Sequence, residues 1–129
     1  MRFSLFFLLL PLFTFGQNVP LTIEVQGLQN SKGKVMIKVV NDQGKEVLKY
    51  SQEIKDIPAK IVLNLAPNRY AISCFHDENN NGEIDKAFTG IPTELYGFSN
   101  DVRGIFGPPD LQDQLFTLQK AMTISLRVQ

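Results

Sequence analysis

Short segments in which apolar and polar residues alternate constrain the fold of this chain more than any other feature. Leu21, Ile23 and Val25 alternate with polar residues in the stretch 21–28. A period of two residues is typical of a β-strand that buries one face. The same period predicts further strands in residues 34–41, 47–54, 59–65, 69–76, 115–118 and 121–128.

Turn-forming residues separate these segments. Gly33, Gly44 and Pro58 each stand between two alternating stretches, and such residues favour tight connections. A helical period is lacking, except for one turn expected within residues 109–116. Many short strands joined by turns predict an all-β fold, namely an antiparallel two-sheet sandwich of the immunoglobulin-like or transthyretin-like type, with a small closed barrel as the alternative.

The stretch LAPNRYAI, residues 65–72, predicts the end of one strand, a tight turn and the start of the next strand. We expect Asn68 to take a left-handed conformation in this turn and Tyr70 to open the following strand. Sandwich domains of the transthyretin-like or carboxypeptidase-regulatory kind are similar here, which supports the architecture.

The beginning of the chain has the composition of a secretory signal. It opens with a positive charge, residues 3–15 are almost entirely apolar, and Gly16 is a small residue before the expected cleavage site. A membrane anchor is the alternative, but the apolar run is shorter than the roughly 20 residues of a spanning helix and contains Pro11. We therefore predict a signal peptide over residues 1–16 and one mature domain over 17–129, periplasmic or secreted, without a membrane span.

The mature domain is close to neutral and contains one cysteine. Removal of the signal, with its single arginine, leaves 12 Lys and Arg against 13 Asp and Glu, so composition does not indicate a nucleic-acid partner. Cys74 has no second cysteine to pair with, so stability has to come from a packed core. The apolar neighbours of Cys74 predict a buried, unreactive thiol.

The alternating pattern stops between residues 76 and 115. A segment of this length without strands is usually functional or disordered, but its many large apolar residues argue against disorder. We expect a long ordered loop insertion whose apolar residues pack as a cap over one end or edge of the sandwich. These residues are Phe88, Ile91, Leu95, Tyr96, Phe98, Ile105 and Phe106.

The start of this segment, HDENNNGEID, has the spacing of a calcium-binding loop. Counted from Asp77, oxygen-bearing side chains fall at positions one, three and five, and Gly82 follows at position six, which is the opening of D-x-[DN]-x-[DN]-G. Calcium takes six to eight oxygen ligands, and the glycine allows the turn that brings the next carbonyl into the site. The predicted metal ligands are Asp77, Asn79, Asn81, the backbone carbonyl of Glu83, Asp85 and the more distant Glu94.

The second half of the loop departs from an EF-hand. Position twelve is Phe88 instead of a bidentate glutamate, and a predicted strand precedes the loop where an EF-hand has a helix. The missing oxygens would come from Asp85, from water or from beyond the loop, where Glu94 is a better candidate than Asp101. The low charge of the first half predicts weak affinity, with a Kd on the order of 10⁻⁴ to 10⁻³ M.

A plain turn without metal is the alternative interpretation of this loop. Asn and Asp are common in turns, and Asn81-Gly82 is itself a favoured hairpin turn. His76, the only histidine, lacks partners for a zinc site and is expected to make a structural hydrogen bond. Neither a hydrolase triad nor a convincing glycosidase pair stands out, so we expect a protein that is not an enzyme.

Three motifs follow one another between Tyr70 and Asn100: a strand that opens with YA, then H-D-x-N-x-N-G-x-x-D, then G-I-P-x-E-x-Y-G-F-S-N. With these motifs the chain resembles bacterial domain-of-unknown-function family 2141, a family of exported domains. The resemblance implies a periplasmic or secreted β-sandwich and brings no established activity or metal. It also implies that the loop and the GIPTELYGFSN segment work as one unit, which fits Glu94 as a distal ligand.

Two functions remain open at the level of sequence. The first is a non-enzymatic exported domain that uses calcium to order its cap and to contact an extracellular or periplasmic partner. The second is a carbohydrate- or peptide-binding module without metal, in which Tyr96, Phe98 and Phe106 contact a glycan or a peptide.

Overall fold

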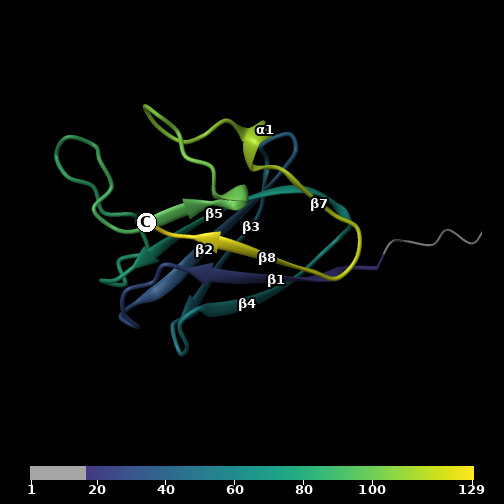
Figure 1. Cartoon of the computed structure of the whole chain (residues 1–129), viewed down its shortest axis with the longest axis horizontal. Coiled ribbons are helices and arrows are strands. Elements are labelled where there is room, and N and C mark those ends of the chain that lie inside the picture. Colours follow the sequence, from purple (N-terminus) through teal and green to yellow (C-terminus); the bar gives the residue numbers. More distant parts are fainter. Residues whose placement is uncertain (1–16) are drawn as a thin grey trace, which may run out of the picture.

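The computed structural model describes residues 17–129, which form two packed β-sheets (Figure 1). The predicted all-β sandwich is therefore confirmed, whereas the predicted signal peptide, residues 1–16, lies outside the described residues. None of the helices in the described part of the chain has the length and apolar character needed to cross a bilayer.

The smaller sheet has three strands in the order β4-β1-β8. They are β1 (Val19–Gln26), β4 (Ala59–Leu65) and β8 (Met122–Arg127). β4 is antiparallel to β1, with Ile23 opposite Ile61, whereas β8 is parallel to β1. The parallel pair departs from the expected antiparallel sandwich, because alternation shows which face of a strand is buried but not its direction.

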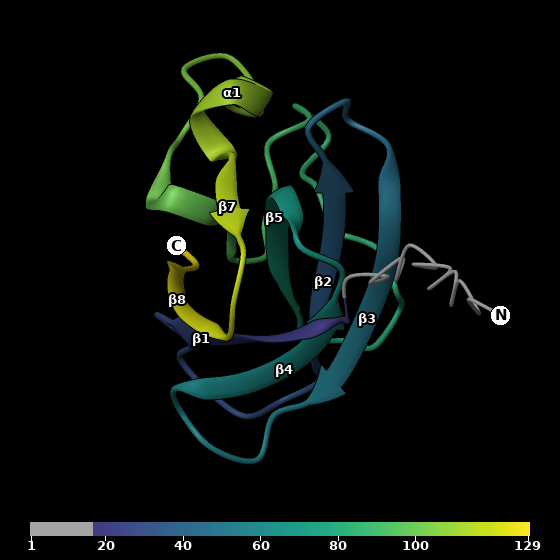
Figure 2. The same cartoon turned by 90° about the vertical axis from the view of Figure 1, so that its right-hand side faces the viewer.

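The larger sheet has five strands and is organised around β5. Its members are β2 (Lys34–Asn41), β3 (Glu46–Glu53), β5 (Asn68–Asp77), β6 (Tyr96–Phe98) and β7 (Phe116–Leu118). β2 pairs along most of one side of β5, and β3 pairs with β2. On its other side β5 pairs first with β7 and then with β6. Figure 2 shows the strands of the smaller sheet running across those of the larger one.

Two short helices interrupt the long connection after β5. They are the 3-10 helix η1 (Ser99–Asp101) and the one-turn α1 (Leu111–Gln114). The position of α1 confirms the helical turn predicted within residues 109–116. The two helices are held together at their base, because the Ser99 hydroxyl donates to the Gln114 carbonyl over 2.6 Å.

The alternating apolar faces of the two sheets form one core. Burying each such side chain contributes about 1.5–3 kcal/mol, so this core can stabilise the fold without a disulfide. Cys74 is buried within it, as predicted. The fully buried aliphatic members are Leu21, Ile23, Val25, Val35, Val39, Ile61, Ile72, Leu118, Leu126 and Val128.

Tyr70 secures the turn between β4 and β5. Its hydroxyl donates a hydrogen bond of 2.6 Å to the carbonyl of Ala66, four residues earlier, as a tyrosine corner does. The prediction that Asn68 is left-handed is wrong, because this residue is already part of β5 and pairs with Leu118 in the extended conformation.

The predicted cap is only partly formed. Leu95, Tyr96 and Phe98 are half-buried, since β6 pairs with β5 and carries the last two onto the sheet. The other four members of the predicted cap are exposed, because they lie on two loops that project away from the sheets (Figure 1). These four are Phe88, Ile91, Ile105 and Phe106.

Candidate functional site

The candidate loop begins at the buried end of β5. His76 and Asp77 are each only 1% exposed. The His76 Nε2–H donates to the carbonyl of Lys32 over 2.5 Å, which confirms the structural hydrogen bond predicted for this histidine. A carbonyl oxygen can only accept, so the ring nitrogen Nε2 carries the proton. Asp77, the first residue of the loop, is therefore held in place and shielded from solvent.

The Asp77 carboxylate lies inside the curl of the loop. Its Oδ1 accepts the backbone N–H of Asn81 at 3.2 Å, and its Oδ2 accepts that of Gly82 at 2.8 Å. The chain reaches this curl through positive φ angles of 57° at Asn80 and 78° at Gly82, a conformation that Asn and Gly adopt most readily. Two backbone dipoles thus face the buried negative charge.

The side chains of Asn79, Asn81 and Asp85 meet across the loop. The amide groups of Asn79 and Asn81 donate to the two Asp85 carboxylate oxygens at 2.5 and 2.6 Å. The Oδ1 atoms of these asparagines accept backbone N–H groups, from Asn81 at 3.3 Å and from Glu83 at 3.0 Å. The structure therefore brings together four of the predicted ligands, including Asp77, around one small volume.

Glu94 supports this arrangement from outside the loop. Its Oε2 accepts the backbone N–H of Glu78 at 2.8 Å, and its Oε1 accepts that of Asp85 at 2.8 Å. One carboxylate therefore joins both ends of the loop, a geometry that suits a positioning residue. The weaker candidate Asp101 lies elsewhere, since its carboxylate accepts the Arg127 backbone N–H at 2.8 Å.

The segment that carries Glu94 is attached to the loop and to β5. Thr93 donates to the Asp85 carbonyl through its backbone N–H at 2.8 Å and its hydroxyl at 3.1 Å. The His76 backbone N–H donates to the Leu95 carbonyl at 2.8 Å. Hydrogen bonds at both ends of the loop thus join it to residues 93–95.

Two contacts from the β1–β2 connection were missed by sequence reasoning. The Asn30 amide donates to the Glu78 carboxylate at 2.5 Å. Gly33, with φ of +67°, lies so close that an added Cβ would stand 1.9 Å from the Asp77 carbonyl oxygen. In the sequence, Gly33 alone could indicate a close backbone contact. Asn30 could not be connected with the loop, because it lies 48 positions away from its partner Glu78.

A comparison with known protein families identifies the family to which this chain belongs. A family model described as "Uncharacterized protein conserved in bacteria (DUF2141)" matches residues 23–125, which include the loop and all but the ends of the sandwich. The chain belongs to the DUF2141 family. No curated protein matches the sequence. Membership confirms the resemblance seen in the sequence, and any function of this DUF2141 chain has to be argued from its own residues.

The donor set of this DUF2141 chain suits a hard cation better than a soft one. Residues 17–129 contain no group of three or more His, Cys, Asp and Glu placed to hold a metal ion. The side chains that meet in the loop are two carboxylates and two amides, and oxygens of this mixture are ones that calcium accepts and zinc rarely uses. The Glu83 side chain is exposed, and the contribution predicted for this residue is that of its backbone carbonyl.

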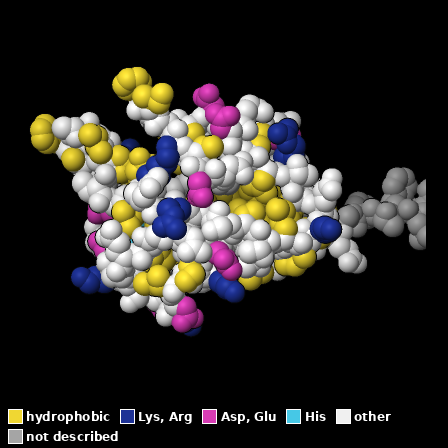
Figure 3. Space-filling model, viewed as in Figure 1, with side chains coloured by type: hydrophobic (Ala, Val, Ile, Leu, Met, Phe, Trp, Pro, Cys, Tyr) yellow, Lys and Arg dark blue, Asp and Glu magenta, His cyan; other side chains and the backbone are white. Residues whose placement is uncertain are grey.

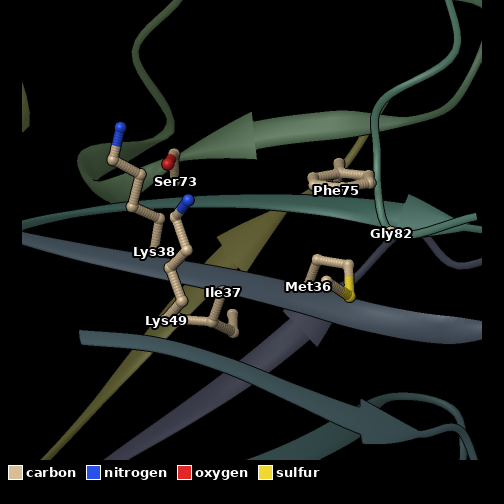
Figure 4. A pocket seen from close by; sticks show the side chains of 7 residues that line it. All are labelled: Met36, Ile37, Lys38, Lys49, Ser73, Phe75 and Gly82. Atoms are coloured by element: carbon tan, nitrogen blue, oxygen red, sulfur yellow. The ribbon is translucent and has the colours of Figure 1, made fainter.

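Gly82 also borders a groove on the outer face of the larger sheet. The groove has a volume of about 220 Å³ and lies over β2, β3 and β5. Lys38 stands directly opposite Lys49 on one side and Ser73 on the other. Figure 4 shows the two lysine side chains projecting on the same side of the sheet, with Phe75 close to the loop. Gly82 is thus exposed at the edge of this groove.

Proposed function

We propose that this DUF2141 protein is an exported, non-enzymatic β-sandwich domain, periplasmic or secreted, whose loop 77–85 binds calcium weakly. The observation that carries the proposal is the convergence of Asp77, Asn79, Asn81 and Asp85 within one curled loop. Together with the Glu83 carbonyl they offer oxygens of the type and number that calcium requires, water completing the shell.

Glu94 acts as a positioning residue in this proposal. Both of its carboxylate oxygens already accept backbone N–H groups, from Glu78 and from Asp85. By holding the two ends of the loop together it reduces the conformational entropy that a bound ion would otherwise have to overcome. Its role is therefore to keep the ligands close before the ion arrives.

The affinity expected from this geometry is low. A calcium ion would have to displace the Asn79 and Asn81 amides from Asp85, where they donate at 2.5 and 2.6 Å. Two carboxylates also supply less charge than tight calcium sites have. A Kd on the order of 10⁻⁴ to 10⁻³ M follows, in the range of extracellular modules, and this range suits a compartment in which free calcium is high.

Two residues support the assignment as a protein that is not an enzyme. His76 is buried and committed to the Lys32 carbonyl, so it cannot reach a substrate as a general base. Cys74 is buried, and burial raises the pKa of its thiol, which keeps it in the unreactive protonated form. The side chains most suited to nucleophilic catalysis are thus held inside the fold.

A glycan- or peptide-binding module without metal is the second candidate. Tyr96 and Phe98 meet edge to face, with ring centres 5.9 Å apart, and they line a groove between the loops. However, the Arg103 guanidinium lies 4.3 Å from the centre of the Tyr96 ring and covers one face. Phe106 projects from a separate loop and is fully exposed, so the three aromatic rings do not form a common stacking platform.

Calcium-dependent thermal unfolding tests the proposal. At a free calcium concentration ten times the Kd, binding adds about 1.4 kcal/mol of stability, which for a domain of this size raises the Tm by about 5 °C. Asp85→Asn should abolish this shift, whereas Asp42→Asn, in the exposed β2–β3 turn, should retain it. An unchanged Tm at 10 mM calcium, or an equal Tm shift in Asp85→Asn, would exclude calcium binding by this loop.

A further inference from the structure

Four large apolar side chains stand almost free of the protein surface. Their relative exposures are 104% for Phe88, 102% for Phe106, 90% for Ile105 and 67% for Ile91. Single exposed apolar residues are common on soluble proteins, but these four lie at the ends of two protruding loops, and Figure 3 shows apolar atoms at both tips. Side chains in this position contribute nothing to the core.

The two loops lie next to each other at one end of the molecule. A groove of about 260 Å³ runs between them, with Ile84 and Pro92 on the first loop and Gly107 and Pro108 on the second. In Figure 1 both tips project toward the upper left, away from the two sheets. A flat surface can therefore touch both tips at once without touching the strands.

Each tip carries a basic residue at the same distance in sequence. Lys86 precedes Phe88 by two residues, and Arg103 precedes Ile105 by two residues. Arg103 is held in place, since its guanidinium donates to the carbonyls of Tyr96 and Gln129 at 2.6 and 2.7 Å. An apolar tip with a cation just behind it matches the depth profile of a phospholipid layer, in which acyl chains lie below negatively charged phosphates.

We propose that the two tips insert into the surface of a membrane that contains anionic phospholipid. The tips are convex and separate, whereas a protein partner would need a matching hollow for each of them. A fluid lipid layer adapts to both without preformed complementarity. The insertion is interfacial, which agrees with the lack of a spanning helix in residues 17–129.

An anionic membrane would be a partner of the proposed exported domain, and binding to it does not require calcium in the loop. Both loops also carry acids, Glu83 and Asp85 on the first and Asp101 and Asp110 on the second, and their charge opposes contact with anionic lipid. Bound calcium would lower that repulsion, so binding should strengthen with calcium if both proposals hold. If only the membrane proposal holds, binding should be the same with calcium and with chelator.

Co-sedimentation with vesicles of phosphatidylglycerol and phosphatidylethanolamine tests the inference. The purified domain should bind these vesicles, and the double variant Phe88→Ser with Phe106→Ser should bind more weakly by on the order of tenfold or more. Val62→Ser is the matched control, because Val62 is an exposed apolar residue on β4. A lack of binding by the wild-type domain, or equal loss in the Val62 control, would overturn the proposal.

Further variants test the contribution of a basic residue to binding and the insertion of one tip into the lipid. Lys86→Gln should weaken binding by about fivefold, whereas Lys120→Gln, in the exposed β7–β8 turn, should have little effect. The chain contains no tryptophan, so Phe88→Trp supplies a single fluorophore whose emission should shift to the blue on insertion. An unshifted emission in the presence of bound vesicles would contradict insertion of this tip.

Self-association is the competing outcome. Sedimentation equilibrium without vesicles would reveal a dimer of the wild-type domain that the Phe88 and Phe106 double variant loses. Such a result would show that the tips bind a second copy of this chain and would overturn the membrane proposal. A calcium titration of the vesicle-free protein separately decides the metal proposal, so failure of one proposal is distinguishable from failure of the other.

Discussion

Asp77 is the residue on which the geometry of the loop depends most. Its side chain is buried, and its negative charge faces the backbone N–H groups of Asn81 and Gly82 at 3.2 and 2.8 Å. A buried charge is tolerated only when such partners replace the lost water. The same carboxylate therefore stabilises the turn without metal and would serve as a ligand with it.

Replacing Asp77 by Asn should destabilise the fold even without calcium. Asn keeps one acceptor oxygen but turns an NH₂ group toward one of the two backbone donors, so a buried hydrogen bond is lost and a donor is left unpaired. We expect a loss of about 1–3 kcal/mol in the free energy of unfolding, measured by urea denaturation in chelator. Asp42→Asn is the control and should change stability by less than about 0.5 kcal/mol; equal effects of both variants would contradict this role of Asp77.

The local part of the site could be predicted from the sequence, and the distant part could not. The convergence of Asn79 and Asn81 follows from their spacing around a glycine, which is a local property. The burial of Asp77 depends on contacts with the β1–β2 connection, and the bonds to Glu94 depend on a connection that folds back. The family motif indicated that Glu94 belongs to the site but not that it holds backbone groups.

At the scale of elements, the loop is an extension of β5 that other elements hold in place. β2 pairs with β5 as far as Asp77, and β6 pairs with its second half. Gly33, just before β2, lies against the Asp77 carbonyl. The position of the loop is therefore set by strand pairing on both sides and by a close backbone contact at its base.

Two glycine substitutions should separate this backbone contact from simple conformational strain. Gly33 and Gly82 have similar φ angles of +67° and +78°, but a Cβ at Gly33 would lie 1.9 Å from the Asp77 oxygen and a Cβ at Gly82 would meet nothing within 4 Å. Gly82→Ala should cost about 1 kcal/mol from the left-handed conformation. Gly33→Ala should cost clearly more in urea denaturation, and equal losses would show that the contact does not matter.

Strand prediction succeeded where apolar and polar residues alternate and failed inside the long connection. The bounds of β2 and β4 agree with the predicted ranges 34–41 and 59–65, and the short β7 lies within the predicted range 115–118. β6 was missed because Tyr96–Phe98 lies within residues 76–115, where the alternation stops. The four exposed apolar residues of the two loops were assigned to a cap, because apolar composition indicates a need for burial but does not say what covers a residue.

At the scale of the whole molecule, one continuous core joins the two sheets and encloses the only thiol. Cys74 pairs with Ile37 across β5 and β2 and packs within the core. Burial raises the pKa of this thiol, since the thiolate would lose its hydration. The reactivity of Cys74 therefore reports on opening of the entire sandwich.

Alkylation of Cys74 should be almost undetectable in the native protein at pH 8. Because the pKa of the thiol is raised in the folded state, an increase in pH toward the ordinary thiol value of about 8.5 should speed labelling of the unfolded chain and leave the folded chain unreactive. Mass spectrometry of iodoacetamide adducts across a urea series should follow the global unfolding curve. Rapid labelling in native buffer would indicate local opening of β5.

The parallel pairing of β1 with β8 has a consequence for how the chain reaches its final shape. Almost the whole described sequence separates Leu21 from its partner Met122. A growing polypeptide can assemble the hairpins of the larger sheet early, but the flank of β1 that pairs with β8 stays open until residues 122–127 have emerged. Completion of the smaller sheet therefore comes after the hairpins of the larger one, and the open edge of β1 is exposed to mispairing until β8 is in place.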